Sequence, residues 1–293
     1  MHRLTPPPVS RLFTHLVPVA CAAVLVAVMG TARVYAASTI LIQDTFADGG
    51  FTNGVDANDA AWASYGSATR TINSGALRVA AAGSDRGVIA GFSATTLAVG
   101  ETLSLTFDFR YTVVPAADNS SALRFGLYNT ATTAVDYNDD FGFRVNTPYG
   151  GTSSPGIIRE TGTSGAIGAG SDSTSLTTPG TFSTFSLGTS WNTLTFSFTR
   201  TDATTLTFDF KVDNISLMTS AASNNSGSIF TFDEVAFVNR AGAATFELDN
   251  INVTLTTVPE PATTAIAIGC IALTGAIGLR RRKAQSAQPA RKD

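Results

Sequence analysis

The stretch Thr102–Val113 reads TLSLTFDFRYTV. Large apolar side chains occupy every second position, and Thr, Ser, Asp and Arg occupy the positions between them. A period of two over a dozen residues is typical of a β-strand with one buried face and one wet face. The stretch therefore predicts a long strand that carries Phe107 and Phe109 into a core and points Asp108 to solvent, so that truncating Asp108 would cost little stability.

Four further stretches repeat this alternation: Leu123–Leu127, Phe141–Val145, Leu194–Phe198 and Leu206–Val212. The polar break at Arg200–Ala203 predicts a hairpin turn between the last two. No stretch from Ala37 to Thr257 has a convincing helical period. The pattern predicts an all-β fold, an antiparallel two-sheet β-sandwich. Segments rich in Gly, Ser and Thr predict long loops at Thr161–Gly180 and Ser220–Ser228, and a short linker at Thr256–Thr257.

The C-terminal region has three ordered parts. Val258-Pro259-Glu260-Pro261 is followed by eighteen uncharged residues, Ala262–Leu279, and then by the basic block Arg280-Arg281-Arg282-Lys283. As a helix, the uncharged run would extend roughly 27 Å at 1.5 Å per residue, close to the ~30 Å thickness of a bilayer core. The positive-inside rule places the basic block in the cytoplasm and the preceding chain across the membrane.

This order of Pro-Glu-Pro box, apolar helix and basic block resembles the PEP-CTERM sorting signal of Gram-negative bacteria. In that family an exosortase recognises the box, removes the helix and tail, and releases the protein towards the cell surface or an extracellular matrix. Ala262 stands where Ser or Thr often follows the box, and the extension Ala284–Asp293 is longer than usual. The resemblance implies transient inner-membrane anchoring followed by a cell-surface or extracellular location. An ordinary C-terminal anchor is the alternative.

The N-terminal region predicts a signal peptide. Arg3 and Arg11 make it positive, Leu16–Met29 is apolar, and Val34-Tyr35-Ala36 offers small residues at the two positions that a signal peptidase reads. Cleavage after Ala36 would leave Ala37 as the first residue of the mature chain. The predicted organisation is a signal peptide at 1–36, a β-sandwich domain at 37–257 and the sorting signal at 258–293.

Charge and composition exclude several functions for the body. The whole chain has a net charge of -3, but residues 37–257 hold 20 Asp and Glu against 10 Lys and Arg, or about -10. Nucleic acid is therefore not an expected partner. His2 and His15 precede the cleavage site, and Cys21 and Cys270 lie in the two apolar segments. Without His or Cys, the body cannot form disulfides, Ser-His-Asp or Cys-His catalytic sites, or imidazole and thiolate metal sites.

The two ends of the body carry a second resemblance. The segment Gln43–Gly49 (QDTFADG), followed by Trp62, and the segment Phe246–Val253 (FELDNINV) resemble the opening and closing strands of exported jelly-roll domains of the concanavalin/laminin-G type. The resemblance implies that the first and last strands pair, which would bring Asp44 near Asp249. It implies an architecture rather than an activity, because this fold hosts lectins, glycosidases, adhesive modules and spacers.

The carboxylates do not match a glycosidase. Laminarinase-type jelly-roll enzymes carry a Glu-x-Asp-x-x-Glu strand, because retention of configuration needs a nucleophile and an acid about 5 Å apart. Here the nearest match is Glu247–Asn252, and Asn252 cannot act as the general acid. The adjacent pairs Asp139-Asp140 and Asp233-Glu234 would point to opposite faces of a strand. We therefore expect no enzymatic activity and no catalytic residues.

Two kinds of binding site stay open. Lectin-like sites combine an aromatic platform with amide and carboxylate groups, which here are offered by Tyr137, Asn138, Asp139, Tyr149 and Trp191. The alternative is that Trp191 and the tyrosines fill the core or its rim.

A structural calcium ion is the second kind, and no other cofactor is expected. Asp44, Asp48, Asp249 and Asn250 offer the hard oxygen ligands that Ca²⁺ requires. The alternative is that Asp48-Gly49-Gly50 is a turn and that Asp249 caps a strand end.

The sequence thus predicts a non-catalytic exported cell-surface or extracellular-matrix protein that is associated with exopolysaccharide. Signal peptidase and an exosortase are its expected partners during export. A carbohydrate-binding, lectin-like module is the alternative function, and a glycoside hydrolase is the least favoured one.

Overall fold

The structure is a computed structural model that describes residues 36–52, 58–115, 119–130, 141–149, 155–161, 173–176, 187–223, 229–240 and 242–257. These residues form fifteen strands, and all the described pairings between strands are antiparallel. Residues 37–257 form one compact unit. Within the described ranges, no helix is long and apolar enough to cross a membrane.

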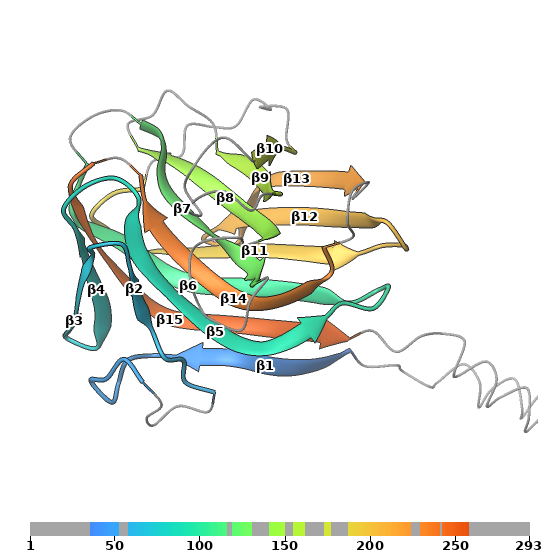
Figure 1. Ribbon diagram of the computed structural model, residues 1–293, viewed down its shortest axis with the longest axis horizontal. Coiled ribbons are helices and arrows are strands. Elements are labelled where there is room, and N and C mark those ends of the chain that lie inside the picture. The colour runs from blue at the N-terminus through green and yellow to red at the C-terminus, as the bar shows by residue number, and fades with distance from the viewer. Residues whose placement is uncertain are drawn as a thin grey trace, which may run out of the picture. The chain divides into compact units, whose positions relative to one another are not determined.

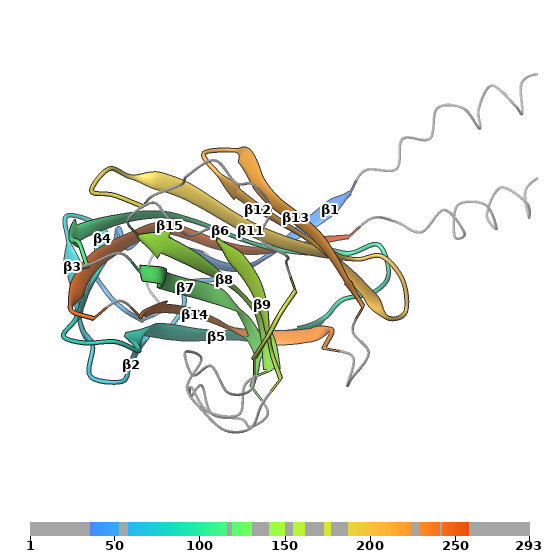
Figure 2. The ribbon, with the colours of Figure 1, turned by 90° about the horizontal axis from the view of Figure 1, so that it is seen from above.

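The strands form two sheets that face each other (Figures 1 and 2). The larger sheet has the order β13-β12-β11-β6-β15-β4-β3, and β1 also pairs with β15. Its strands are β1 (Ala37–Asp44), β3 (Thr69–Asn73), β4 (Ala76–Ala81), β6 (Thr102–Val113), β11 (Asn192–Arg200), β12 (Thr205–Val212), β13 (Ile215–Ser223) and β15 (Ala244–Thr257).

The smaller sheet has the order β10-β9-β8-β7-β14-β5-β2. Its strands are β2 (Ala63–Tyr65), β5 (Arg86–Thr96), β7 (Asn119–Asn129), β8 (Phe141–Tyr149), β9 (Gly156–Glu160), β10 (Ser173–Ser175) and β14 (Thr231–Asn239). The predicted antiparallel two-sheet sandwich is confirmed for the described residues.

The core lies between the sheets and is rich in aromatic rings. The inward positions of β6, including Phe107 and Phe109, are fully buried. The Phe107 ring lies edge-on to Phe125 of β7 and Phe237 of β14, with ring centroids 4.9 and 4.7 Å apart. Edge-to-face contacts of this kind add to the hydrophobic gain from burial. Asp108 lies on the opposite face, as the period of two predicts.

The predicted hairpin and the predicted pairing of the chain's first and last strands are both present. β11 and β12 pair around the Arg200–Ala203 break. β15 is long enough for its first half to pair with β4 and its second half with β1, so that Asp44 lies opposite Ile251. β1 and β4 therefore lie end to end beside β15 (Figure 1).

Three segments predicted as loop or linker contain strand residues. β10 lies within Thr161–Gly180, β13 extends to Ser223, and Thr256 and Thr257 pair with Ser38 and Ala37. At these described positions the predictions were wrong, because Thr and Ser suit both loops and the outward face of a strand. The predicted signal peptide up to Tyr35 and the sorting motif from Val258 to Lys283 lie outside the described residues.

Candidate functional site

The candidate site lies where the pairing of two strands is irregular. The register of β5 against β14 jumps between Thr95–Phe232 and Gly91–Glu234, so that the β5 residues 92–94 face a single residue of β14. Such a bulge bends a strand and re-aims its side chains. The register of β1 against β15 also jumps, between Ile40 and Ile42.

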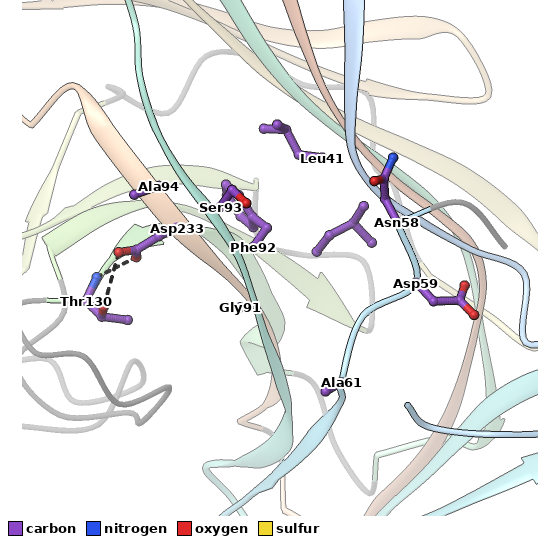
Figure 3. Close-up of a pocket in the computed structure, with 11 residues that line it drawn as sticks. Leu41, Asn58, Asp59, Ala61, Gly91, Phe92, Ser93, Ala94, Thr130 and Asp233 are labelled. Carbon is purple, nitrogen blue, oxygen red and sulfur yellow. Dashed lines mark hydrogen bonds between the residues drawn. The ribbon is translucent and has the colours of Figure 1, made fainter. Parts of the chain in front are cut away.

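An open groove of about 730 Å³ lies at these two irregularities. The larger sheet contributes β1 to its walls, and the smaller sheet contributes β5 and β14, which carries Asp233. Figure 3 shows the β5 segment between two other walls, Asn58–Asp59 on one side and Thr130 with Asp233 on the other. The lining residues are Leu41, Ile42, Asn58, Asp59, Ala61, Gly91, Phe92, Ser93, Ala94, Thr130 and Asp233.

Asp233 is held in position by the end of β7. Its Oδ1 atom accepts a hydrogen bond from the Thr130 backbone N–H at 2.8 Å, and its Oδ2 atom accepts one from the Thr130 hydroxyl at 3.2 Å (Figure 3). The Asn129 side chain donates to the Thr231 carbonyl at 3.0 Å and ties the same two strands together. The carboxylate of Asp233 is therefore oriented by the protein before any ligand arrives.

Asn58 fixes the opposite wall against β1. Its side-chain amide donates to the Ile40 backbone carbonyl at 3.1 Å, and the backbone carbonyl of Asn58 accepts from the Gln43 backbone N–H at 3.2 Å. Asn58 has a φ of 65°, in the left-handed region that Asn tolerates better than most residues. Asp59 follows directly and is partly exposed in the groove wall.

Asp44 lies behind this wall and is almost fully buried. Its Oδ2 atom accepts from the Trp62 indole N–H at 2.7 Å, and its Oδ1 atom accepts from the Phe46 N–H at 2.9 Å. Burial raises the pKa of Asp44 to about 6, because it penalises the charged form; the two hydrogen bonds oppose this, and the charges of Asp59 and Asp48 add to it. Asp44 thus joins the end of β1 to the segment that carries the groove wall.

The groove combines the groups that recognise polyhydroxylated ligands. Asp59 and Asp233 accept hydrogen bonds, the hydroxyls of Ser93 and Thr130 both donate and accept, and Phe92 offers an apolar ring. No Lys or Arg belongs to the described lining residues. The described part of the groove is therefore acidic.

The structure gives the predicted calcium ligands other contacts. Asp48 accepts from the Gly50 N–H at 2.9 Å and so forms the alternative turn. Asp249 accepts from the Asn250 N–H at 2.7 Å at a bulge inside β15, not at a strand end. Among the described residues, no three or more His, Cys, Asp or Glu side chains gather closely enough to hold a metal ion. Asp44, Asp48 and Asp249 are therefore not gathered as a set of three carboxylate ligands in this structure.

Tyr149 and Trp191, the two predicted glycan contacts that the structure describes, do not line the groove. Tyr149, at the end of β8, is half-buried against the Tyr111 ring at a centroid distance of 5.7 Å, which agrees with the core alternative. Trp191 is 39% exposed beside the larger sheet, and the Arg110 guanidinium lies 4.5 Å from its ring centroid. Tyr137, Asn138 and Asp139 lie outside the described residues.

The segment that resembles a glycosidase motif forms a structural ion pair. Glu247 is fully buried. Its Oε2 atom accepts from two nitrogens of Arg110 at 2.8 and 2.6 Å, and its Oε1 atom accepts from the Asn73 side chain at 2.7 Å. Both oxygens of Glu247 are thus engaged by protein groups. In the same segment, burial, with the charge of Asp108 as a smaller cause, raises the pKa of Asp249.

A second group of buried polar side chains was missed by the sequence analysis. It lies on the outward positions of the smaller sheet and comprises Tyr65, Arg124, Tyr128, Arg144, Glu160 and Glu234, each at most 7% exposed. Arg144 forms an ion pair with Glu160. Burial, followed by the charges of Arg144 and Arg240, lowers the pKa of Arg124 to about 10. The alternation over Leu123–Leu127 predicted Arg124 to be wet. This prediction was wrong, because a period of two does not show whether the second face is covered.

Comparisons with known proteins assign no family. No protein-family model and no curated protein matches the chain. Among solved structures it is similar to the potassium-bound carbohydrate recognition domain of Emp46p (11% identity, 66% of this chain and 87% of that one, TM-score 0.41). It is also similar to alginate lyase Aly36B (13%, 74% and 96%, 0.40) and to an endo-1,3-beta-glucanase from Streptomyces sioyaensis (11%, 76% and 97%, 0.42). Similarity at this level assigns no activity to the chain.

Proposed function

We propose that the protein is a non-catalytic, exported protein of the cell surface or extracellular matrix, and that its body binds extracellular polysaccharide in the groove between β1 and β5. The observation that carries the proposal is the groove itself. Its volume of about 730 Å³ falls in the range typical of ligand sites, and its walls combine carboxylates, hydroxyls and an aromatic ring. A groove that is open to solvent suits a segment of a long chain.

The available side chains support a binding role without chemistry. The body has neither His nor Cys, so a hydrolase would have to rely on carboxylates. In the segment that resembles a glycosidase motif, Glu247 is engaged by Arg110 and Asn73, and Asn252 stands at the position of the second Glu. That segment therefore lacks both a free nucleophile and a general acid.

The chain termini support the exported location. The positive and apolar N-terminal region, the Pro-Glu-Pro box and the basic block are the features from which we propose processing by signal peptidase and an exosortase-like enzyme. On this proposal the inner membrane holds the protein only transiently.

A glycan array probed with the full-length protein tests the binding function. Phe92→Ala should weaken any observed glycan binding about tenfold, because it removes the ring from the groove. Trp191→Ala is the matched control, since it removes an aromatic ring outside the groove. Loss of binding in Trp191→Ala alone would move the site to the outer face of the larger sheet, and no binding to any glycan would refute the proposed function.

A further inference from the structure

We infer that the groove selects glycans that carry free amines, that is, polymers of partly or fully deacetylated amino sugars, over neutral or uronic-acid glycans. This inference rests on the proposed function, and it deepens that function by naming the class of ligand.

Charge is the first reason. Asp59 and Asp233 lie in opposite walls of the groove, and Lys and Arg are absent from its described lining. A concave site lined by one sign of charge concentrates ligands of the opposite sign and repels those of the same sign.

The anchoring of Asp233 is the second reason. A carboxylate offers about four acceptor positions, of which Thr130 uses two. The described ion pairs of the protein use Asp85, Glu160, Asp209 and Glu247, and none includes Asp233. Asp233 is thus a pre-oriented anion without a described cationic partner. An ammonium group on the ligand would form a charge-assisted hydrogen bond with it, which is stronger than a bond to a neutral hydroxyl.

The net charge of the body has the same sign as the described groove lining. A body charge of about -10 disfavours polyuronates as ligands and favours the approach of polycations.

Isothermal titration of the full-length protein in mild detergent with three oligosaccharides of equal length tests the inference. These are a glucosamine oligomer, its fully N-acetylated counterpart and an oligouronate, all at a mildly acidic pH. We expect the glucosamine oligomer to bind roughly tenfold more tightly than the acetylated one, as one added charge-assisted bond would produce, and the oligouronate not to bind.

Two substitutions separate a specific site from general attraction to an acidic protein. Asp233→Asn should reduce the ratio of the affinity for the glucosamine oligomer to the affinity for the acetylated oligomer to nearly one. Asp59→Asn, a second and independent groove variant, should also lower this ratio. Asp209→Asn is the control, because it removes the same charge from the partly exposed outer face of the larger sheet, where Asp209 contacts Lys211 and Ser216. It should leave the preference unchanged.

The outcomes distinguish this inference from the function on which it rests. Equal affinity for the glucosamine and acetylated oligomers would overturn the amine selectivity and leave polysaccharide binding intact. An equal effect of Asp233→Asn and Asp209→Asn would show that the attraction is general, and would also overturn it. Failure of all glycans to bind, here and on the array, would overturn both proposals.

Discussion

Asp108 shows at the scale of a single residue how an outward position can still be tied to the fold. It lies between Phe107 and Phe109 on β6 and faces away from the core, but it is only partly exposed. Its Oδ1 atom accepts from the Thr193 hydroxyl at 2.6 Å, and its Oδ2 atom accepts from the Asn250 side chain at 2.7 Å. The alternation predicted the face correctly and missed both partners.

Truncation of these neighbours should have unequal effects. Phe107→Ala is expected to lower the free energy of unfolding by about 3–5 kcal/mol, because it empties a fully buried site against the rings of Phe125 and Phe237. Asp108→Ala should cost about 1–2 kcal/mol, since it leaves the Thr193 and Asn250 groups without their acceptor. Urea melts of both variants measure this. EDTA should change neither value, and a calcium-dependent loss in Asp108→Ala would contradict the assignment of Asp108 to hydrogen bonds alone.

The buried Asp44 carboxyl should make stability depend on pH. Because its pKa is raised from 3.8 to about 6 in the folded state, folding favours the protonated form. The contribution of Asp44 to stability is therefore fully present below about pH 4 and is lost as the pH rises through about 6. Relative to Asp44→Asn, the wild type should therefore lose free energy of unfolding between these values. Urea melts across this interval test it, and parallel curves for the two proteins would show that Asp44 titrates normally.

At the scale of elements, bulges matter more than regular pairing for the site. The irregular registers of β1 and β5 place residues from five separate segments around one groove. The segment before β2 is held in place by Asn58, whose amide and carbonyl both bond to β1. The groove wall therefore depends on a residue with a positive φ and a side-chain hydrogen bond.

Substitution of Asn58 should separate these two contributions. Asn58→Ala is expected to cost about 1–3 kcal/mol of unfolding free energy, because Ala loses the bond to Ile40 and is strained at a φ of 65°. Asn58→Gly should cost less, about 1 kcal/mol, since Gly adopts this φ without strain. Thermal or urea melts compare the two. If Ala proves no worse than Gly, backbone strain does not contribute at this position.

At the scale of the whole molecule, the described strands begin at Ala37 and end at Thr257. β1 pairs with the last residues of β15, so the two ends of the described unit lie side by side (Figure 1).

Intact mass spectrometry of the protein released by its host tests that route. The mature species should begin at Ala37 and lack the residues after the Pro-Glu-Pro region, because signal peptidase and the exosortase remove both ends. A mutant in which Glu260 is replaced by Ala should keep the basic block Arg280–Lys283. A wild-type mature species that retains this block would reduce the C-terminal region to a plain membrane anchor.

The sequence by itself determined the sandwich, its long central strand β6 and the β11–β12 hairpin. The pairing of the first and last strands was implied by the resemblance of the two ends of the body to jelly-roll domains. Alternation along a strand is a local property, and the apolar face must be buried against a second sheet. Turn chemistry at Arg200–Ala203 is local in the same sense.

Only the tertiary structure decided the groove and the buried charges. Asp59, Phe92 and Asp233 are far apart in the chain, and they meet because two bulges form against particular partner strands. Arg124 and Arg144 occupy the outward positions of two alternating stretches, yet both are buried. Whether a second sheet face is covered, and where a ladder slips by a residue, depends on contacts between distant segments, so a period of two along one strand cannot reveal either.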